Sequence, residues 1–178
     1  ADRDFDSVIA NARGHTVFFN AWGGDDKINA YIDWAGGQLS DRFGIKLVHV
    51  KLSDTGAAVS RILAEKAAGR DSRGSIDLLW VNGENFAAMK RYALLQPAPW
   101  VEGLPNWRYT DAVALPALKL DFAEPTDGLE SPWGRAQLVF AYDSNITPQP
   151  PRNATELASY IKANPGRFTY PLPPDFVG

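Results

Sequence analysis

The chain has 178 residues, of which 45% are hydrophobic and 12% aromatic, and its formal net charge is −3. This composition suffices for a packed core and argues against a disordered chain, and the acidic balance argues against nucleic acid or an anionic membrane as the main partner. No apolar run approaches the roughly 18 residues that span a bilayer, and the absence of cysteine excludes disulfides, thiol nucleophiles and cysteine-ligated metals.

The first half of the chain alternates between strand-like and helix-like patterns. The strand patterns cover residues 16–21, 45–50 and 76–80, and a short helix over 5–13 precedes the first of them. The helix after the first strand begins near Asp25 or Asp26 and stops at Phe43-Gly44. The helix after the second strand follows residues 53–56 and ends near Gly69, and the helix after the third covers residues 86–92. The order βαβαβα, with helical crossovers of this length, implies a parallel sheet and right-handed connections.

The second half is less regular. Residues 96–132 carry many turn-forming residues, most of them prolines, and read as a long loop, which in a compact domain packs against something or carries function. A strand is then predicted over 137–142, followed by a helix that opens at Asn153 or Thr155 and closes at residues 164–166. A last strand is predicted over 167–170.

Each of the first three predicted strands ends in a polar turn that feeds a helix. In open parallel sheets, ligands bind just beyond the carboxyl ends of the strands, where backbone N–H groups and short polar side chains gather. Three such turns predict a capture surface rather than a single catalytic residue. The candidate ligand-binding residues of these turns are Trp22, Gly23, Gly24, Asp25, Ser53, Asp54, Thr55, Asn82, Gly83, Glu84 and Asn85.

The residues of the first two turns also have purely structural interpretations. Trp22 is either a stacking wall for a ligand or the lid of a tight turn. Asp25 and Asp26 would attract an amine, yet both are ordinary helix caps, and capping is preferred for at least one of them. Capping is also preferred for Asp54, while the role of Thr55 stays open.

The third turn is the densest polar cluster. Asn82, Glu84 and Asn85 all carry hydrogen-bonding side chains, which a simple turn does not require, and this favours a binding role.

Four segments resemble one known family. The segments are Trp22-Gly23-Gly24 after the first strand, residues 80–86 after the third, the Pro132-Trp133-Gly134 segment within residues 131–143, and residues 168–176. Together they resemble the N-terminal half of a bacterial periplasmic solute-binding protein, the extracytoplasmic receptor of an ABC importer, in the branch that holds polyamine, thiamine and ferric-iron binders.

The resemblance implies an α/β fold: a periplasmic-binding-protein-like lobe with a mainly parallel sheet flanked by helices, plus the start of a second α/β lobe. The first lobe would cover residues 1–137, without its C-terminal return segments. Residues 138–178 would form the hinge strand and the truncated opening of the second lobe. The implied localisation is periplasmic, with a signal peptide already removed, and the implied partners are a small solute and an ABC permease of the inner membrane.

The resemblance also extends the candidate site beyond the first lobe. Trp133 and Arg135 next to the hinge would clamp a ligand, although hinge packing and a surface arginine are the alternative. Asp175 and Phe176 would lie in the first ligand-facing loop of the second lobe.

The ligand class stays open between a cation and an anion. Carboxylates at the turns suit an amine, while helix N-termini, hydroxyl and amide donors and Arg135 suit a phosphate or carboxylate. A thiamine derivative satisfies both and ranks first, a polyamine second, and a sugar stacked on Trp22 or Trp133 third. No adjacent tyrosine pair supports iron, and His15 and His49 belong to no ligand-spaced cluster, so no metal and no cofactor are expected.

Catalytic signatures are missing from the sequence. It contains no nucleophile elbow, Walker loop, dinucleotide-binding glycine motif or zinc-protease motif. We therefore expect a binding protein rather than an enzyme. The alternative is a metabolite-sensing domain of a regulator, or an α/β enzyme that uses the same sheet edge.

Overall fold

The computed structural model describes residues 5–70, 72–97, 100–134 and 139–171. It divides into two compact units, Ala1–Pro132 and Trp133–Gly178. The sequence placed this division a few residues later, after residue 137.

The first unit is built on a parallel sheet with β1 (Thr16–Trp22) in the middle. β2 (Lys46–Leu52) and β3 (Leu78–Leu79) pair with β1 on either side, in the order β2-β1-β3. Although β3 is shorter than predicted, the Asp77 and Trp80 N–H groups still donate to carbonyls of β1, at 3.1 and 2.9 Å. The predicted α/β class with a parallel sheet is confirmed.

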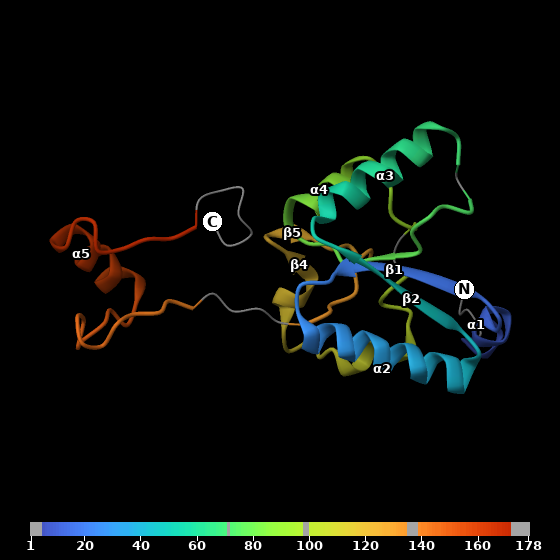
Figure 1. Ribbon diagram of the computed structural model, residues 1–178, viewed down its shortest axis with the longest axis horizontal. Helices are drawn as coiled ribbons and strands as arrows, with labels where there is room; N and C mark the ends of the chain where they lie inside the picture. The colour runs from blue at the N-terminus through green and yellow to red at the C-terminus, as the bar shows by residue number, and fades with distance from the viewer. Residues whose placement is uncertain (1–4, 71, 98–99, 135–138, 172–178) are drawn as a thin grey trace. The chain divides into compact units, whose positions relative to one another are not determined.

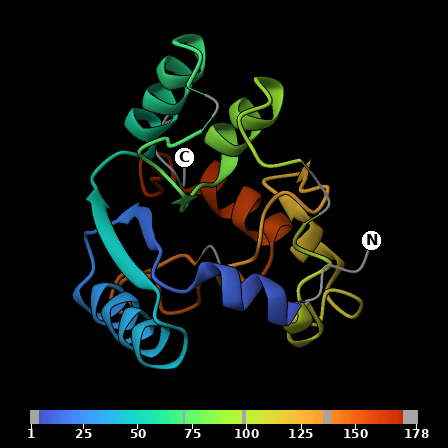
Figure 2. The ribbon, with the colours of Figure 1, turned by 90° about the vertical axis from the view of Figure 1, so that its right-hand side faces the viewer.

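Helices cover both faces of this sheet. α2 (Asp26–Phe43) lies on one face, and α3 (Thr55–Ala67) and α4 (Gly83–Arg91) lie together on the other (Figures 1 and 2). The chain crosses from β1 to β2 through α2 and returns past β1 through α3, so right-handed crossovers place these helices on opposite faces. The preceding helix, α1, spans Phe5–Ala12. The core of the unit includes Ala21, Ile32, Ala58, Val59, Phe86 and Met89.

The helix ends follow the predicted capping chemistry. The Asp25 carboxylate accepts the N–H groups of Lys27 and Ile28 and opens α2, and Asp54 accepts the Gly56 N–H and opens α3. Gly44 ends α2 with a φ of 66°, in the left-handed region that glycine enters without strain.

Residues 96–132 contain more local structure than the sequence predicted. They form two 3₁₀ helices, η1 (Pro105–Tyr109) and η2 (Pro116–Lys119), and a short hairpin of β4 (Leu120–Asp121) and β5 (Glu124–Pro125). Strands this short have no periodicity that a sequence can reveal.

In the second unit the predicted helix is present as α5 (Ala154–Ala163), with Asn153 as its cap. The strands predicted over 137–142 and 167–170 are wrong for the described residues, because 139–142 and 167–170 form no strand. A strand requires a hydrogen-bonded neighbour, and none of the described segments pairs with either one. Their aromatic side chains pack on each other instead, with ring centroids of Phe140 and Phe168 5.7 Å apart.

We predict that Phe86→Ala lowers the free energy of unfolding by about 3–5 kcal/mol, because Phe86 is fully buried and its removal leaves a cavity. Urea denaturation measures this loss. Phe140→Ala is the matched control: Phe140 is 58% exposed, so its replacement should cost less than about 1 kcal/mol. Equal losses for the two variants would contradict the assignment of the core.

Candidate functional site

The three predicted turns lie along one edge of the sheet, which we call the rim: residues 22–25, 53–55 and 82–85. The parallel register sets Trp22 opposite Leu52 and Asn20 opposite Leu79, so the three strands end at the same edge. The Gly23 N–H donates to the Leu52 carbonyl at 3.1 Å, which joins the first turn to the second.

Side chains make the rim continuous. The rings of Trp22 and Trp80 meet edge to face, with centroids 6.4 Å apart, and so join the first turn to the end of β3. A side chain at Gly56 would lie 3.4 Å from the Asp54 carboxylate and 3.7 Å from Asn85 Oδ1, so the second and third turns are neighbours as well. The structure therefore brings the predicted residues of all three turns together.

The first turn depends on its two glycines. A Cβ at Gly24 would lie 2.4 Å from Trp22 Cζ2, and a Cβ at Gly23 would lie 2.6 Å from Lys51 Cβ. Only glycine lets the indole fold over the turn. Trp22 nevertheless keeps 45% of its surface exposed, so it packs on the turn and still offers an aromatic face to solvent.

The carboxylates of the rim divide into two groups. Those of Asp25 and Asp54 are engaged in capping α2 and α3. The second group is the carboxylate of Glu84, which is exposed in the first turn of α4. Ser53, beside the α3 cap, is exposed as well. Asn82 occupies the N-cap position of α4, but its side chain makes no capping hydrogen bond.

Two buried asparagines near the first turn were missed by the sequence analysis. Asn29 Nδ2 donates to the Gly23 carbonyl at 3.0 Å, and Asn29 is 7% exposed. The other side-chain atom of Asn29, Oδ1, has no hydrogen-bond partner among the described residues. Asn20 is 1% exposed, and neither its side-chain nitrogen nor its side-chain oxygen has a partner there. A buried polar atom without a partner costs about 1–3 kcal/mol. The signal for Asn20 is visible in the sequence as one amide within the apolar run of the first strand.

A second missed group comes from the β4–β5 hairpin. The Gly83 N–H, at the start of α4, donates to Asp121 Oδ2 at 2.6 Å, so a distant carboxylate caps this helix. Burial raises the pKa of Asp121, and the bond from Gly83 opposes that rise. Burial also raises the pKa of Glu130 to about 8, and the nearby charge of Asp121 adds to this effect.

The remaining predicted residues belong to the second unit. Trp133 is 46% exposed. Arg135, Asp175 and Phe176 lie outside the described residues.

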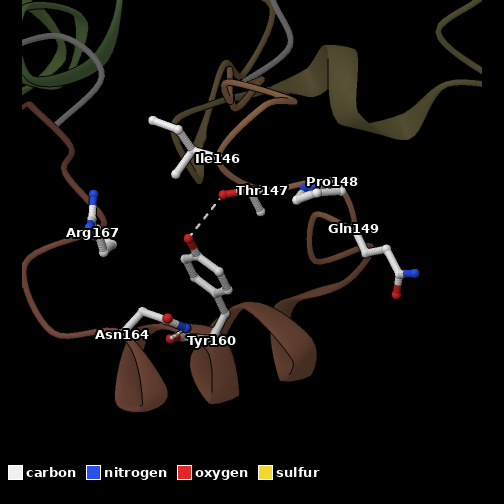
Figure 3. A pocket seen from close by; sticks show the side chains of 7 residues that line it. All are labelled: Ile146, Thr147, Pro148, Gln149, Tyr160, Asn164 and Arg167. Atoms are coloured by element: carbon white, nitrogen blue, oxygen red, sulfur yellow. Dashed lines mark hydrogen bonds between the residues drawn. The ribbon is translucent and has the colours of Figure 1, made fainter.

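The second unit has a hollow of about 490 Å³ (Figure 3). Tyr160 points from α5 toward Thr147, and their hydroxyl oxygens are 3.2 Å apart. Among the described residues that line this hollow, Arg167 is the only charged one. A smaller hollow of about 310 Å³ lies between α2 and β2, next to His49. Neither of these two hollows is lined by a described residue of the rim.

Within the described residues, no cluster of three or more histidine or acidic side chains could hold a metal ion. No helix in the same part of the chain combines the length and apolar character needed to cross a membrane.

Comparison with known proteins relates the chain to a longer protein. No family model matches the chain. The chain is 53% identical over 175 residues to Protein YnjB of Escherichia coli (strain K12), and this alignment covers 98% of the chain but 44% of that relative. The chain therefore spans less than half the length of the relative, whose name states no activity.

We predict that protonation of Glu130 makes stability depend on pH. Between the usual carboxyl pKa of 4.5 and about 8, the folded protein holds a proton at Glu130 that the unfolded chain has lost. The free energy of unfolding therefore falls as pH rises through this window. Glu130→Gln, which does not ionise, should flatten this part of the profile in urea denaturation at a series of pH values.

Glu102→Gln is the control for that experiment. Glu102 is an exposed carboxylate paired with Lys119 at 3.3 Å, and its removal should leave the slope unchanged. If the free energy of unfolding changed with pH in the same way for the wild-type chain and for Glu130→Gln, Glu130 would be an ordinary surface carboxyl.

Proposed function

We propose that this protein is an extracytoplasmic solute-binding receptor of an ABC importer and that it captures a small polar solute at the rim. The single observation that supports this most strongly is the continuity of the rim, in which the ends of β1, β2 and β3 and the caps of three helices meet along one edge. Ligands of open α/β sheets bind at such an edge.

The proposed mechanism is hinge closure. The rim would form one wall of a cleft between two lobes, and the solute would favour the closed form by binding it more tightly than the open form. A permease in the inner membrane would then recognise the closed receptor, which the proposal places in the periplasm. No chemical step on the solute is assigned to any residue.

The charge of the rim favours a cationic solute. Asp25, Asp54 and Asp121 cap the three helices, and each caps with a carboxylate. The helix N-termini are therefore already occupied by negative groups, and the exposed Glu84 adds another. The half-exposed indole of Trp22 offers a face on which a cation stacks favourably. A thiamine-like solute with its aromatic cation fits this combination best, and a polyamine fits second.

We predict that the chain binds thiamine or spermidine in preference to the neutral sugar maltose, and that Trp22→Ala weakens this binding by roughly tenfold, in line with the loss of one cation–aromatic contact. Titrations followed by the amide resonances of residues 22–26, 53–56 and 82–85 would detect even weak binding and would locate it.

Trp34→Ala is the matched control, because Trp34 is an exposed tryptophan on α2, 58% exposed, that stacks on Tyr31. It should bind the solute as the wild-type chain does. If none of the three compounds shifts a rim resonance, or if the shifts fall only elsewhere, the receptor proposal loses its site. If the chain bound maltose more tightly than thiamine and spermidine, the proposed solute would be a sugar and no longer a cation.

A further inference from the structure

The larger hollow, in the second unit, lies between α5 and a turn that precedes this helix in the chain. In the turn, the Asp143 carbonyl accepts the N–H groups of Ile146 and Thr147, at 3.1 and 2.8 Å. Tyr160 reaches from α5 to Thr147, and their hydroxyl groups meet across the hollow (Figure 3). The seven lining residues all lie between positions 146 and 167, so the second unit forms this hollow by itself.

The turn that ends α5 sets Arg167 beside the hollow. The Asn164 N–H donates to the Tyr160 carbonyl at 2.9 Å, and the Arg167 N–H donates to the Asn164 carbonyl at 3.2 Å. Between them Gly166 has a φ of 75°, in the left-handed region that glycine enters without strain, and this lets the chain turn at the end of the helix. Local hydrogen bonds therefore fix the backbone of Arg167 next to the hollow.

The charge at the hollow is positive. No described carboxylate forms an ion pair with Arg167. The two described acidic residues of this unit bind other groups: Asp143 accepts a backbone N–H of its own turn at 2.8 Å, and Glu156 accepts two hydrogen bonds at the start of α5, at 2.8 and 2.7 Å. The carbonyl end of α5 carries about half a negative charge, which the full positive charge of Arg167 outweighs.

The hydroxyl pair is a second polar group of the hollow. The oxygens of Tyr160 and Thr147 are 3.2 Å apart, and the hydroxyl that accepts this bond keeps its own proton, which it can donate to a ligand. Ile146 and Pro148 add apolar surface to the lining, as does the ring of Tyr160. A ligand that matches this lining is negatively charged at one end and apolar in its body.

We propose that the hollow binds a small monocarboxylate with an apolar body, whose carboxylate is held by Arg167 and the hydroxyl pair. A guanidinium group donates two parallel hydrogen bonds to a carboxylate, and one cationic side chain matches the single charge of a carboxylate better than the higher charge of a phosphate. The volume of about 490 Å³ is typical of sites for small molecules. This site goes beyond the proposed receptor function, because it shares no residue with the rim and takes a ligand of the opposite charge.

Benzoate, a monocarboxylate with an aromatic body, tests the site in the 178-residue chain by NMR titration. We expect benzoate to shift the amide resonances of Thr147, Gln149 and Arg167 and the side-chain Nε–H resonance of Arg167. Benzamide has nearly the same shape without the charge and should bind at least roughly tenfold more weakly. Inorganic phosphate lacks the apolar body and should also bind more weakly than benzoate.

Variants of the polar groups test which side chains hold the carboxylate. Arg167→Gln should weaken benzoate binding by roughly tenfold or more, because hydrogen bonds to a charged group are lost, and Tyr160→Phe by roughly threefold, because one hydroxyl is lost. Arg152→Gln is the matched control, since Arg152 is an exposed arginine of the same unit that does not line the hollow. It should bind benzoate as the wild-type chain does.

The proposal is overturned if benzoate shifts none of these resonances, or if Arg167→Gln binds benzoate as tightly as the wild-type chain. Equal affinity for benzamide, or tighter binding of phosphate, would overturn the assignment of a carboxylate. The comparison of benzoate with benzamide needs only the wild-type chain, so it decides even if a variant does not fold. The receptor proposal is judged by cationic solutes at the rim, so either proposal can fail while the other stands.

Discussion

Parallel pairing of β1 with both of its neighbours is the interaction on which the rest of the structure depends. The register that sets Trp22 beside Leu52 and Asn20 beside Leu79 fixes where the three strands end. A shift of one residue would send the side chains of a strand to the opposite face. The helices, their caps and the rim follow from that register, since each helix begins where its strand stops.

At the rim, one residue type can serve both the fold and the proposed function. A carboxylate at a helix N-terminus contributes about 0.5–2 kcal/mol to stability through its hydrogen bonds, and the same charge attracts a cation. The caps at Asp25, Asp54 and Asp121 therefore set the sign of the rim's electrostatic field while they hold the helices. For this reason a capping role and a ligand-attracting role are compatible at these positions.

The sequence predicted features that depend on local chemistry. The helices from Asp25 to Gly44 and after Asp54 could be read from caps, apolar spacing and a terminal glycine, and the α/β class followed from their order. The sequence did not predict the features that depend on partners far away along the chain. Nothing near Asp121 indicates that it caps a helix begun by Gly83, 38 positions away along the chain. The strands expected at 137–142 and 167–170 failed similarly, because a β-like composition makes a strand only where another strand pairs with it.

The central claim, that the three turns form one solute-binding surface, is tested most directly by single-cysteine reporters in this cysteine-free chain. Asp26→Cys, Ser53→Cys and Glu84→Cys each place an environment-sensitive fluorophore on an exposed position in one turn or directly beside it, and Asp41→Cys places it near the far end of α2. The account predicts that one solute changes the fluorescence of all three turn reporters with a single dissociation constant and leaves the Asp41 reporter unchanged. Responses with different constants, or an equal response at Asp41, would contradict it.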